Sequence, residues 1–287
     1  MIAQSLLKAR ELEAILTEHG TRDTLPATDT VQQASASIIP SLPLSGLGED
    51  KIADHLVQQL VPGFNGSSLS PHYYGFVTGG ATPIARLADH IVSVWDQNVC
   101  IHLPSETITT AVDDGALSML LELFSLPRAD FPARVFTTGA TASNILGLAC
   151  GRDYVVAHHL AKAGHEYEEE EGLLSACLRA GIKKIQILST MPHSSLGKAA
   201  SIVGIGSKEM IDVSTEGHPL KFDMFKLEEY LSTSNTASIV AISCAEVNTG
   251  SFTTSGLAEI QEIRYLCDRY SAWLHVDAGK SENLLSS

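Results

Sequence analysis

The stretch of sequence that decides the fold runs from residue 238 to residue 278 and reads SIVAISCAEVNTGSFTTSGLAEIQEIRYLCDRYSAWLHVDA. Its two ends, residues 238–244 and 273–276, are short runs rich in apolar side chains, which is typical of buried strands. Between them, residues 256–270 repeat apolar side chains at helical spacing. A strand, a helix and a second strand form a βαβ unit, whose strands run parallel. This stretch therefore predicts an α/β fold.

The same alternation of strands and helices extends back to Arg134. Further candidate strands lie at residues 135–137, 184–188 and 201–203, and further candidate helices at residues 141–162, 172–180 and 223–232. Before about residue 130 the chain is mainly helices and loops, with helical patterns at residues 1–20, 51–60, 83–97 and 105–124 and a polar connector up to Pro43. The sequence predicts a helical N-terminal segment and then a mostly parallel sheet with helices on both faces.

Composition excludes several classes of function. The 19 basic and 33 acidic side chains give a net charge of −14, which argues against binding to nucleic acid or anionic lipid. No apolar run approaches the roughly 20 residues of a membrane-spanning helix. The five cysteines are odd in number, widely spaced and without a C-x-x-C pair, so neither a disulfide framework nor a zinc site is expected. We expect a cytoplasmic protein without a bound metal.

Three segments carry residues suited to chemistry. The run Phe136-Thr137-Thr138-Gly139-Ala140-Thr141-Ala142-Ser143-Asn144 leads through small residues into a helix, whose N-terminus favours an anion such as phosphate, although such residues also cap ordinary helices. His193 follows the candidate strand 184–188, at the edge of the sheet where α/β proteins bind ligands, although a loop histidine is often structural. Asp277 ends an apolar strand and needs a cationic or hydrogen-bonding partner there.

Taken in order, these segments resemble the group II pyridoxal-phosphate (PLP)-dependent decarboxylases, which include aromatic-amino-acid, tyrosine and glutamate decarboxylases. The resemblance runs from about Ser70 to Ala278. The matching stretches are the small-residue turn with Ser143-Asn144, Pro192-His193-Ser194-Ser195, Asn248-Thr249-Gly250 and His275-Val276-Asp277-Ala278, with Pro71-His72-Tyr73 and Trp95-Asp96-Gln97-Asn98 also similar.

The resemblance implies a fold-type I PLP-dependent transferase-like large domain and a carboxy-lyase activity on an amino acid, in a homodimer. It implies that Ala140 and Thr141 bind the cofactor phosphate. It also implies that His193 stacks on the pyridine ring and takes part in proton delivery, which makes it the expected catalytic residue. Asp277 would pair with the protonated ring nitrogen and so keep the ring ready to accept electrons.

The resemblance also implies a lysine that forms a Schiff base with the cofactor, some tens of residues beyond the aspartate. Lys280 lies only three residues beyond Asp277, too close to reach the other side of the ring. We therefore expect an N-terminal dimerisation segment at residues 1–75, an incomplete PLP-binding domain at residues 76–278 and a tail outside the family at residues 279–287. On this interpretation the chain ends before the Schiff-base lysine, holds PLP non-covalently at best and is inactive alone.

Two alternatives remain open at this point. The chain could be a non-catalytic partner that dimerises with a full-length enzyme, or another fold-type I PLP enzyme such as an aminotransferase. The substrate class is open as well. His72, Tyr73, Tyr74 and Phe76 mildly favour an aromatic amino acid, although an aromatic loop often serves packing alone.

Overall fold

The computed structural model describes residues 24–69, 80–168, 171–245 and 250–279. The chain forms two compact units, Met1–Pro132 and Ala133–Ser287. The division coincides with the change in sequence pattern at Arg134. The helix predicted at residues 1–20, the boundary predicted at residue 75 and most of the predicted tail at residues 279–287 lie outside the described residues.

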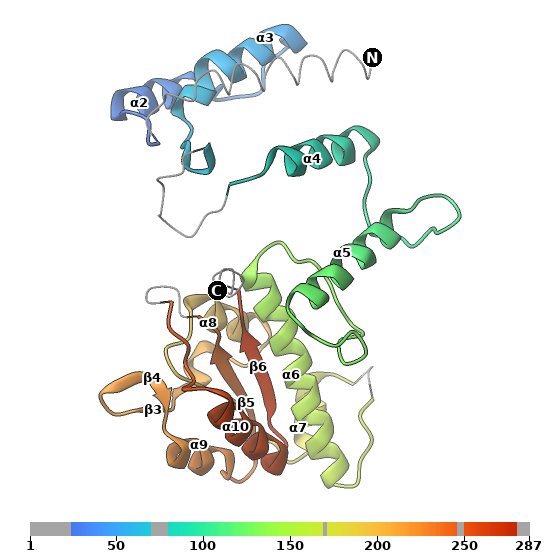
Figure 1. Cartoon of the computed structure of the whole chain (residues 1–287), viewed down its shortest axis with the longest axis vertical. Coiled ribbons are helices and arrows are strands. Elements are labelled where there is room, and N and C mark those ends of the chain that lie inside the picture. Colours follow the sequence, from blue (N-terminus) through green and yellow to red (C-terminus); the bar gives the residue numbers. More distant parts are fainter. Residues whose placement is uncertain (1–23, 70–79, 169–170, 246–249, 280–287) are drawn as a thin grey trace. The chain divides into compact units, whose positions relative to one another are not determined.

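The first unit is helical in its described part, as predicted (Figure 1). Its elements are α2 (Thr28–Ser37), α3 (Glu49–His55), η1 (Leu56–Leu60), η2 (Val61–Gly63), η3 (Ser67–Leu69), α4 (Pro83–Trp95) and α5 (Thr109–Leu123). Helix α2 was predicted as part of a polar connector, and that prediction was wrong. It packs against η2 by close approach, since a Cβ on Gly63 would lie 2.5 Å from Cβ of Ala34. One small buried side chain gave too weak an apolar pattern for the sequence to reveal this helix.

The second unit is built on a four-stranded sheet with the order β2-β1-β5-β6. Its strands are β1 (Lys184–Ser189), β2 (Met210–Asp212), β5 (Thr236–Ser243) and β6 (Trp273–Asp277). All neighbouring pairs are parallel, with Leu188 opposite Val240 and Ala241 opposite His275. From Ala237 to Ser243, every residue of β5 is buried, which is expected of a central parallel strand covered on both faces.

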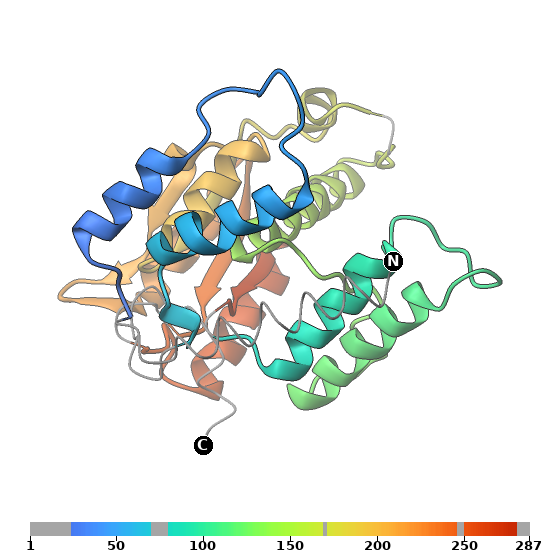
Figure 2. The same ribbon diagram turned by 90° about the horizontal axis from the view of Figure 1, so that it is seen from above.

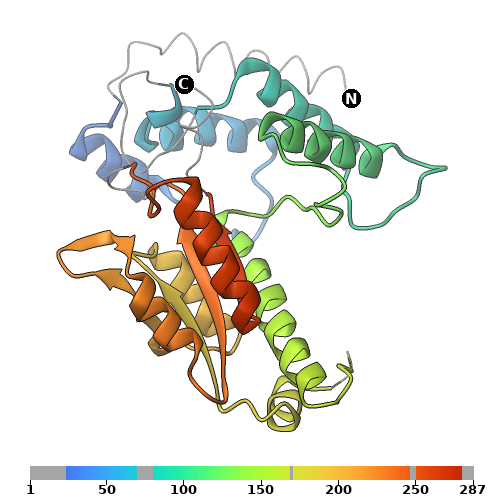
Figure 3. The same cartoon turned by 60° about the horizontal axis from the view of Figure 1, so that its bottom comes forward.

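Helices cover both faces of this sheet, which confirms the predicted fold class (Figure 3). Helices α6 (Ala140–Lys162), α7 (Leu173–Arg179) and α8 (Ser194–Ile202) lie on one face, and α9 (Met224–Leu231) and α10 (Leu257–Tyr270) on the other. Because side chains alternate along a strand, Ile187 and Ile239 enter the first core while Leu188 and Val240 enter the second.

Two predicted strands were wrong. Residues 201 and 202 are the last residues of helix α8, and Val203 is its C-cap. Ala199, Ala200 and Val203 are buried in the first core, and Gly204 follows with φ of +80°. Residues 135–137 form no strand, and Val135 and Phe136 are exposed. At residues 201–203, local β-propensity gave way to the packing of α8 in the first core.

The sequence also missed β2 and a small antiparallel hairpin, β3 (Ser214–Thr215) and β4 (His218–Phe222). The hairpin projects beside the main sheet (orange in Figures 1 and 2). Pro219 in β4 lacks a backbone donor, which fits a two-stranded edge and weakened the strand pattern. Among the helices that the structure describes, none is both long and apolar enough to cross a membrane.

Candidate cofactor site

The predicted site residues of the second unit lie on three elements that meet through hydrogen bonds. Asp277 ends β6, His193 immediately precedes α8, and Ala140 and Thr141 begin α6. The side-chain amide of Asn144, on the second turn of α6, donates to Oδ2 of Asp277 at 3.0 Å and to Oγ of Ser195 at 3.1 Å. Oγ of Ser195 lies 2.7 Å from Nδ1 of His193. A continuous chain of contacts therefore joins the acid, the imidazole and the start of α6.

Asp277 is held at both carboxylate oxygens. Oδ2 accepts from Asn144, and Oδ1 accepts from the backbone N–H of Gly279 at 3.3 Å. The backbone carbonyl of Asp277 accepts from the N–H of Cys244 at 2.8 Å, so the end of β6 stays paired with the chain beyond β5. The side chain is half-buried, which leaves part of the carboxylate accessible to a cationic partner.

His193 acts as the N-cap of α8. Its Nδ1 accepts a hydrogen bond from the backbone N–H of Ser195 at 3.2 Å, in place of the hydroxyl or carboxylate that usually caps a helix. The rest of the side chain is exposed. The ring is thus anchored at one nitrogen, on a side chain that is exposed in the described part of the chain.

The N-terminus of α6 offers unpaired donors. Within the part of the chain that the structure describes, the backbone N–H groups of Ala140 and Thr141 have no hydrogen-bond partner, while those of Ala142 and Ser143 bond to the carbonyl of Gly139. Gly139 has φ of +149°, a conformation that favours glycine. Free N–H groups at a helix N-terminus attract an anion.

The start of α6 also lies close to the acid. A Cβ built on Gly279 would be 3.0 Å from Cβ of Ala140 and 3.5 Å from Oδ1 of Asp277. The predicted anion-binding turn and the predicted acid are therefore neighbours in space, although 137 positions separate them along the chain.

Sequence reasoning did not predict which residues connect the site through hydrogen bonds. These residues are Asn144, Ser195 and His275. Nε2 of the buried His275 lies 2.8 Å from Oδ1 of Asn144. Burial lowers the pKa of His275 below its ordinary value, although the Asp277 carboxylate acts in the opposite direction. One signal was present in the sequence, because His275 precedes Asp277 by two residues and so faces the same side of β6.

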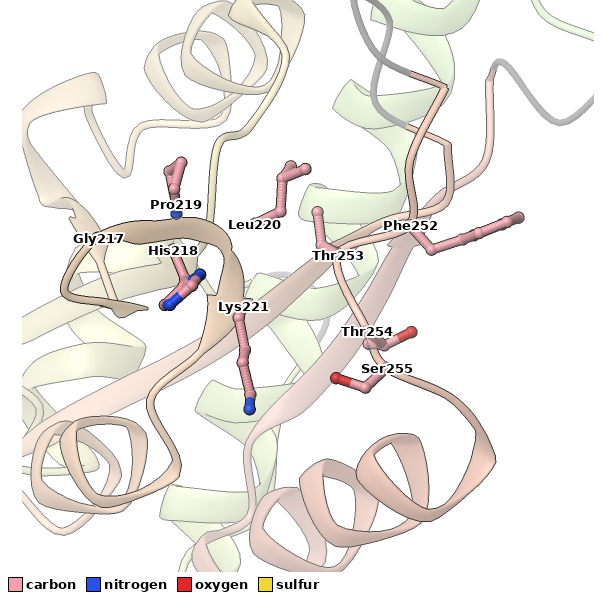
Figure 4. Close-up of a pocket in the computed structure, with 9 residues that line it drawn as sticks. All are labelled: Gly217, His218, Pro219, Leu220, Lys221, Phe252, Thr253, Thr254 and Ser255. Carbon is pink, nitrogen blue, oxygen red and sulfur yellow. The ribbon is translucent and has the colours of Figure 1, made fainter.

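A separate groove with a volume of about 340 Å³ lies between the β3–β4 hairpin and the loop before α10 (Figure 4). Its lining residues are Gly217, His218, Pro219, Leu220, Lys221, Phe252, Thr253, Thr254 and Ser255. None of the predicted site residues lines it. Among the described residues, no group of three or more His, Cys, Asp or Glu side chains is arranged to hold a metal ion.

The parallel sheet, the anion-attracting helix start and the acid at a strand end define an α/β protein with a candidate cofactor site. A family model described as "Pyridoxal-dependent decarboxylase conserved domain" matches residues 33–285. The chain belongs to this family, which confirms the resemblance seen in the sequence.

Individual relatives are distant. The chain is 23% identical to an aspartate 1-decarboxylase of Aliivibrio fischeri over 94% of this chain and 50% of the relative. It is 25% identical to an L-2,4-diaminobutyrate decarboxylase of Acinetobacter baumannii over 54% of this chain and 30% of the relative. The chain therefore spans half or less of the length of these two relatives.

Solved structures share the fold at low sequence identity. A glutamate decarboxylase domain from Vibrio parahaemolyticus aligns with a TM-score of 0.71 and 15% identity, over 97% of this chain and 58% of that one. An Oryza sativa TDC solved with PLP and tryptamine aligns with a TM-score of 0.71 and 17% identity, over 96% and 56%. These alignments confirm a fold-type I architecture for the chain.

Proposed function

We propose that this chain binds PLP between α6, α8 and β6 and that it serves the decarboxylation of an amino acid. The observation that carries the proposal is the hydrogen-bond chain from Asp277 through Asn144 and Ser195 to His193. It gathers at one place an acid, an exposed imidazole and a helix N-terminus with free donors. PLP presents a ring nitrogen, a flat ring face and a phosphate, so each group of the chain has a matching part of the cofactor.

The phosphate would be bound at the start of α6. The backbone N–H groups of Ala140 and Thr141 have no partner among the described residues and can donate to it, and Thr141 is exposed at the same turn. The helix dipole adds a partial positive charge there. Because Gly279 lies close to both Ala140 and Asp277, the phosphate end of the proposed site is next to the acid end.

The ring would be bound by Asp277 and His193. An accessible carboxylate stabilises a proton on the ring nitrogen, and the exposed imidazole offers a flat face for stacking. PLP supplies the electron sink that accepts the electron pair left when carbon dioxide departs. The role of the protein is to hold the ring nitrogen protonated, to orient the ring and to keep an imidazole next to it for proton transfer.

We propose that this chain holds PLP without a covalent bond. The proposal rests on the position of Lys280, which lies only three residues beyond Asp277 in the sequence and outside the described residues. Without the covalent bond we expect the chain to be inactive alone.

PLP titration of the purified chain, followed by absorbance, tests the function. Saturable binding that a substitution at Asp277 weakens supports it, and absence of binding overturns it. Borohydride treatment of the PLP-loaded chain tests whether PLP is bound without a covalent bond. We expect no lysine peptide to carry the cofactor, and a labelled lysine would overturn the proposal of non-covalent binding.

The substrate proposal is an aromatic amino acid, and it depends on the aromatic stretch at residues 71–76, which lies outside the described residues. Similar proteins carry names that refer to acidic and diamino substrates as well. Binding of L-tryptophan, L-aspartate and L-2,4-diaminobutyrate to the PLP-loaded chain separates these classes. Tightest binding of L-tryptophan would support the proposal, and tightest binding of either of the others would replace it.

We also propose that the chain forms a homodimer through its helical first unit and that it is cytoplasmic. Helix α4 supports the dimer because it exposes an apolar stripe, formed by Ile84, Leu87, Ile91 and Trp95. All five cysteines are free thiols, which suits a reducing compartment.

A further inference from the structure

Asn144 is a buried polar side chain whose three hydrogen bonds reach two other elements. Its exposed fraction is 2%, so its amide needs partners within the protein. The amide bonds to Asp277 and His275 on β6 and to Ser195 on α8. The same residue therefore ties α6 to both of the elements that carry the proposed ring-binding groups.

The orientation of this amide follows from its neighbours. The Asp277 carboxylate can only accept a hydrogen bond when ionised, so the NH₂ group of Asn144 must face it. The opposite orientation would place the amide oxygen 3.0 Å from a carboxylate oxygen. With the NH₂ group fixed toward Asp277 and Ser195, the oxygen of Asn144 accepts from Nε2–H of His275.

The same reasoning fixes the direction of the hydrogen bonds at His193. Nδ1 of His193 accepts from the backbone N–H of Ser195 and therefore carries no proton. The Ser195 hydroxyl must then donate to Nδ1, while its oxygen accepts from Asn144. The His193 ring is left with its proton on Nε2, on the side away from α8.

We propose that Asn144 and Ser195 are positioning residues that couple the Asp277 carboxylate to the His193 ring. Asn144 aims the carboxylate, and by donating to Oγ of Ser195 it leaves the Ser195 hydroxyl hydrogen to bond Nδ1 of His193, which reinforces the tautomer that the backbone N–H of Ser195 selects. His275 secures the other end of the Asn144 amide, and the lowered pKa of this buried ring keeps it a neutral donor. The inference rests on the proposed function only in that Asp277 and His193 are taken as the groups that face PLP.

The coupling is a property of the chain itself, so it can be tested without cofactor. The purified chain, labelled with ¹⁵N in its histidine and asparagine side chains, gives separate resonances for the ring nitrogens and for the two amide protons of Asn144. We expect Nδ1 of His193 to be unprotonated and Nε2 of both His193 and His275 to be protonated. A wild-type protein in which Nδ1 of His193 carries the proton would overturn the proposal.

The variants Ser195→Ala and Asn144→Leu test the coupling. In Ser195→Ala, we expect the Nδ1 resonance of His193 to shift and one amide proton of Asn144 to move, while His275 stays unchanged. In Asn144→Leu, we expect the resonances of both His193 and His275 to shift, although of these two histidines only His275 is hydrogen-bonded to Asn144. The double variant should shift His193 no further than Ser195→Ala does, because the two side chains act in series.

Ser201→Ala is the matched control, since the hydroxyl of this exposed serine on α8 donates to the carbonyl of Gly197 and not to a residue of the proposed site. It should leave both histidines unchanged. A folded Asn144→Leu protein with unchanged His193 resonances would overturn the coupling. If circular dichroism shows that Asn144→Leu does not fold, the coupling is judged from the Asn144 amide proton resonances in Ser195→Ala. Unchanged amide proton resonances in that variant would overturn the coupling. PLP titration is independent of these resonance measurements. If the chain binds no PLP but shows the coupling, only the proposed function is overturned.

Discussion

At the scale of single residues, the site depends on polar side chains that satisfy one another. Burial of Asn144 and His275 would cost free energy if their polar atoms had no partners, and each supplies what the other needs. Sequence reasoning found His193 and Asp277 because each follows an apolar strand pattern. It missed the role of Asn144, because a hydrogen bond between residues 133 positions apart leaves no local pattern in the chain.

The charge of Asp277 is the residue-scale feature most open to test. Asp277→Asn keeps the shape of the side chain but removes the charge that would hold a proton on the ring nitrogen. Hydrogen bonds to charged groups contribute about 1.5–3 kcal/mol, so we expect PLP affinity to fall by roughly ten- to a hundredfold. Absorbance titration of the folded variant measures the change.

Asp212→Asn is the control for this variant. Asp212 also ends a strand of the same sheet, but it is exposed and bonds to Ser214. Its substitution should leave PLP affinity unchanged. Equal loss in both variants would show a general effect of charge, and no loss in Asp277→Asn would remove Asp277 from the proposed site.

At the scale of secondary structure, the site depends on how closely α6 lies on β6. A Cβ on Gly147 would lie 2.5 Å from Cε1 of His275, and a Cβ on Gly151 would lie 2.5 Å from Cδ1 of Trp273. The two glycines are one turn apart, so they clear one side of α6 for the two rings. This close approach is what brings Asn144, on the same helix, within reach of Asp277.

The sequence predicted these elements unevenly, and the reason is physical. Strands β1, β5 and β6 were predicted because each is a short run rich in apolar side chains, although only the inner strands have neighbours on both sides in the described sheet and Val276 of β6 is exposed. Strand β2 is three residues long and ends in an acid, so its only signal is its pairing with β1. The close contact of α6 with β6 was not predicted, because a glycine inside a helix has several explanations in the sequence. Only the structure shows that Gly147 and Gly151 face the rings of His275 and Trp273.

Gly147→Ala tests the close approach. Alanine is a better helix former than glycine by about 1 kcal/mol, so helix propensity alone predicts a more stable protein. The added methyl would instead press on a buried ring held by Asn144, and overpacking of this kind costs about 1–3 kcal/mol. We expect a net loss of up to about 2 kcal/mol in the free energy of unfolding, measured by urea denaturation.

Gly197→Ala in α8 serves as its control. The nearest atom to a Cβ there is Sδ of Met210 at 3.4 Å, an ordinary contact with a flexible side chain. This variant should be as stable as the original chain or slightly more stable. If Gly147→Ala were stabilised to the same extent, α6 could not lie as close to β6 as the structure has it.

At the scale of the whole molecule, the two units differ in how they use apolar side chains. The second unit encloses two cores, one on each face of its sheet. In α4 of the first unit no residue is buried, although the helix carries a well-formed apolar stripe. Exposed apolar patches of this kind mark surfaces that another protein surface covers. In the proposed homodimer, a second copy of the chain covers the stripe.

The stripe makes this proposal testable in solution. Leu87 and Ile91 lie one turn apart within it, and both are exposed in the single chain. The double substitution Leu87→Glu and Ile91→Glu would place two charges where apolar side chains meet, so we expect a dimer to separate into monomers in light scattering after size exclusion. Ser93→Glu adds a charge on the opposite side of α4 and should leave the dimer intact. A monomeric original chain, or a double variant that stays dimeric, would contradict dimerisation through α4, and the second result would direct the search to other surfaces of the chain.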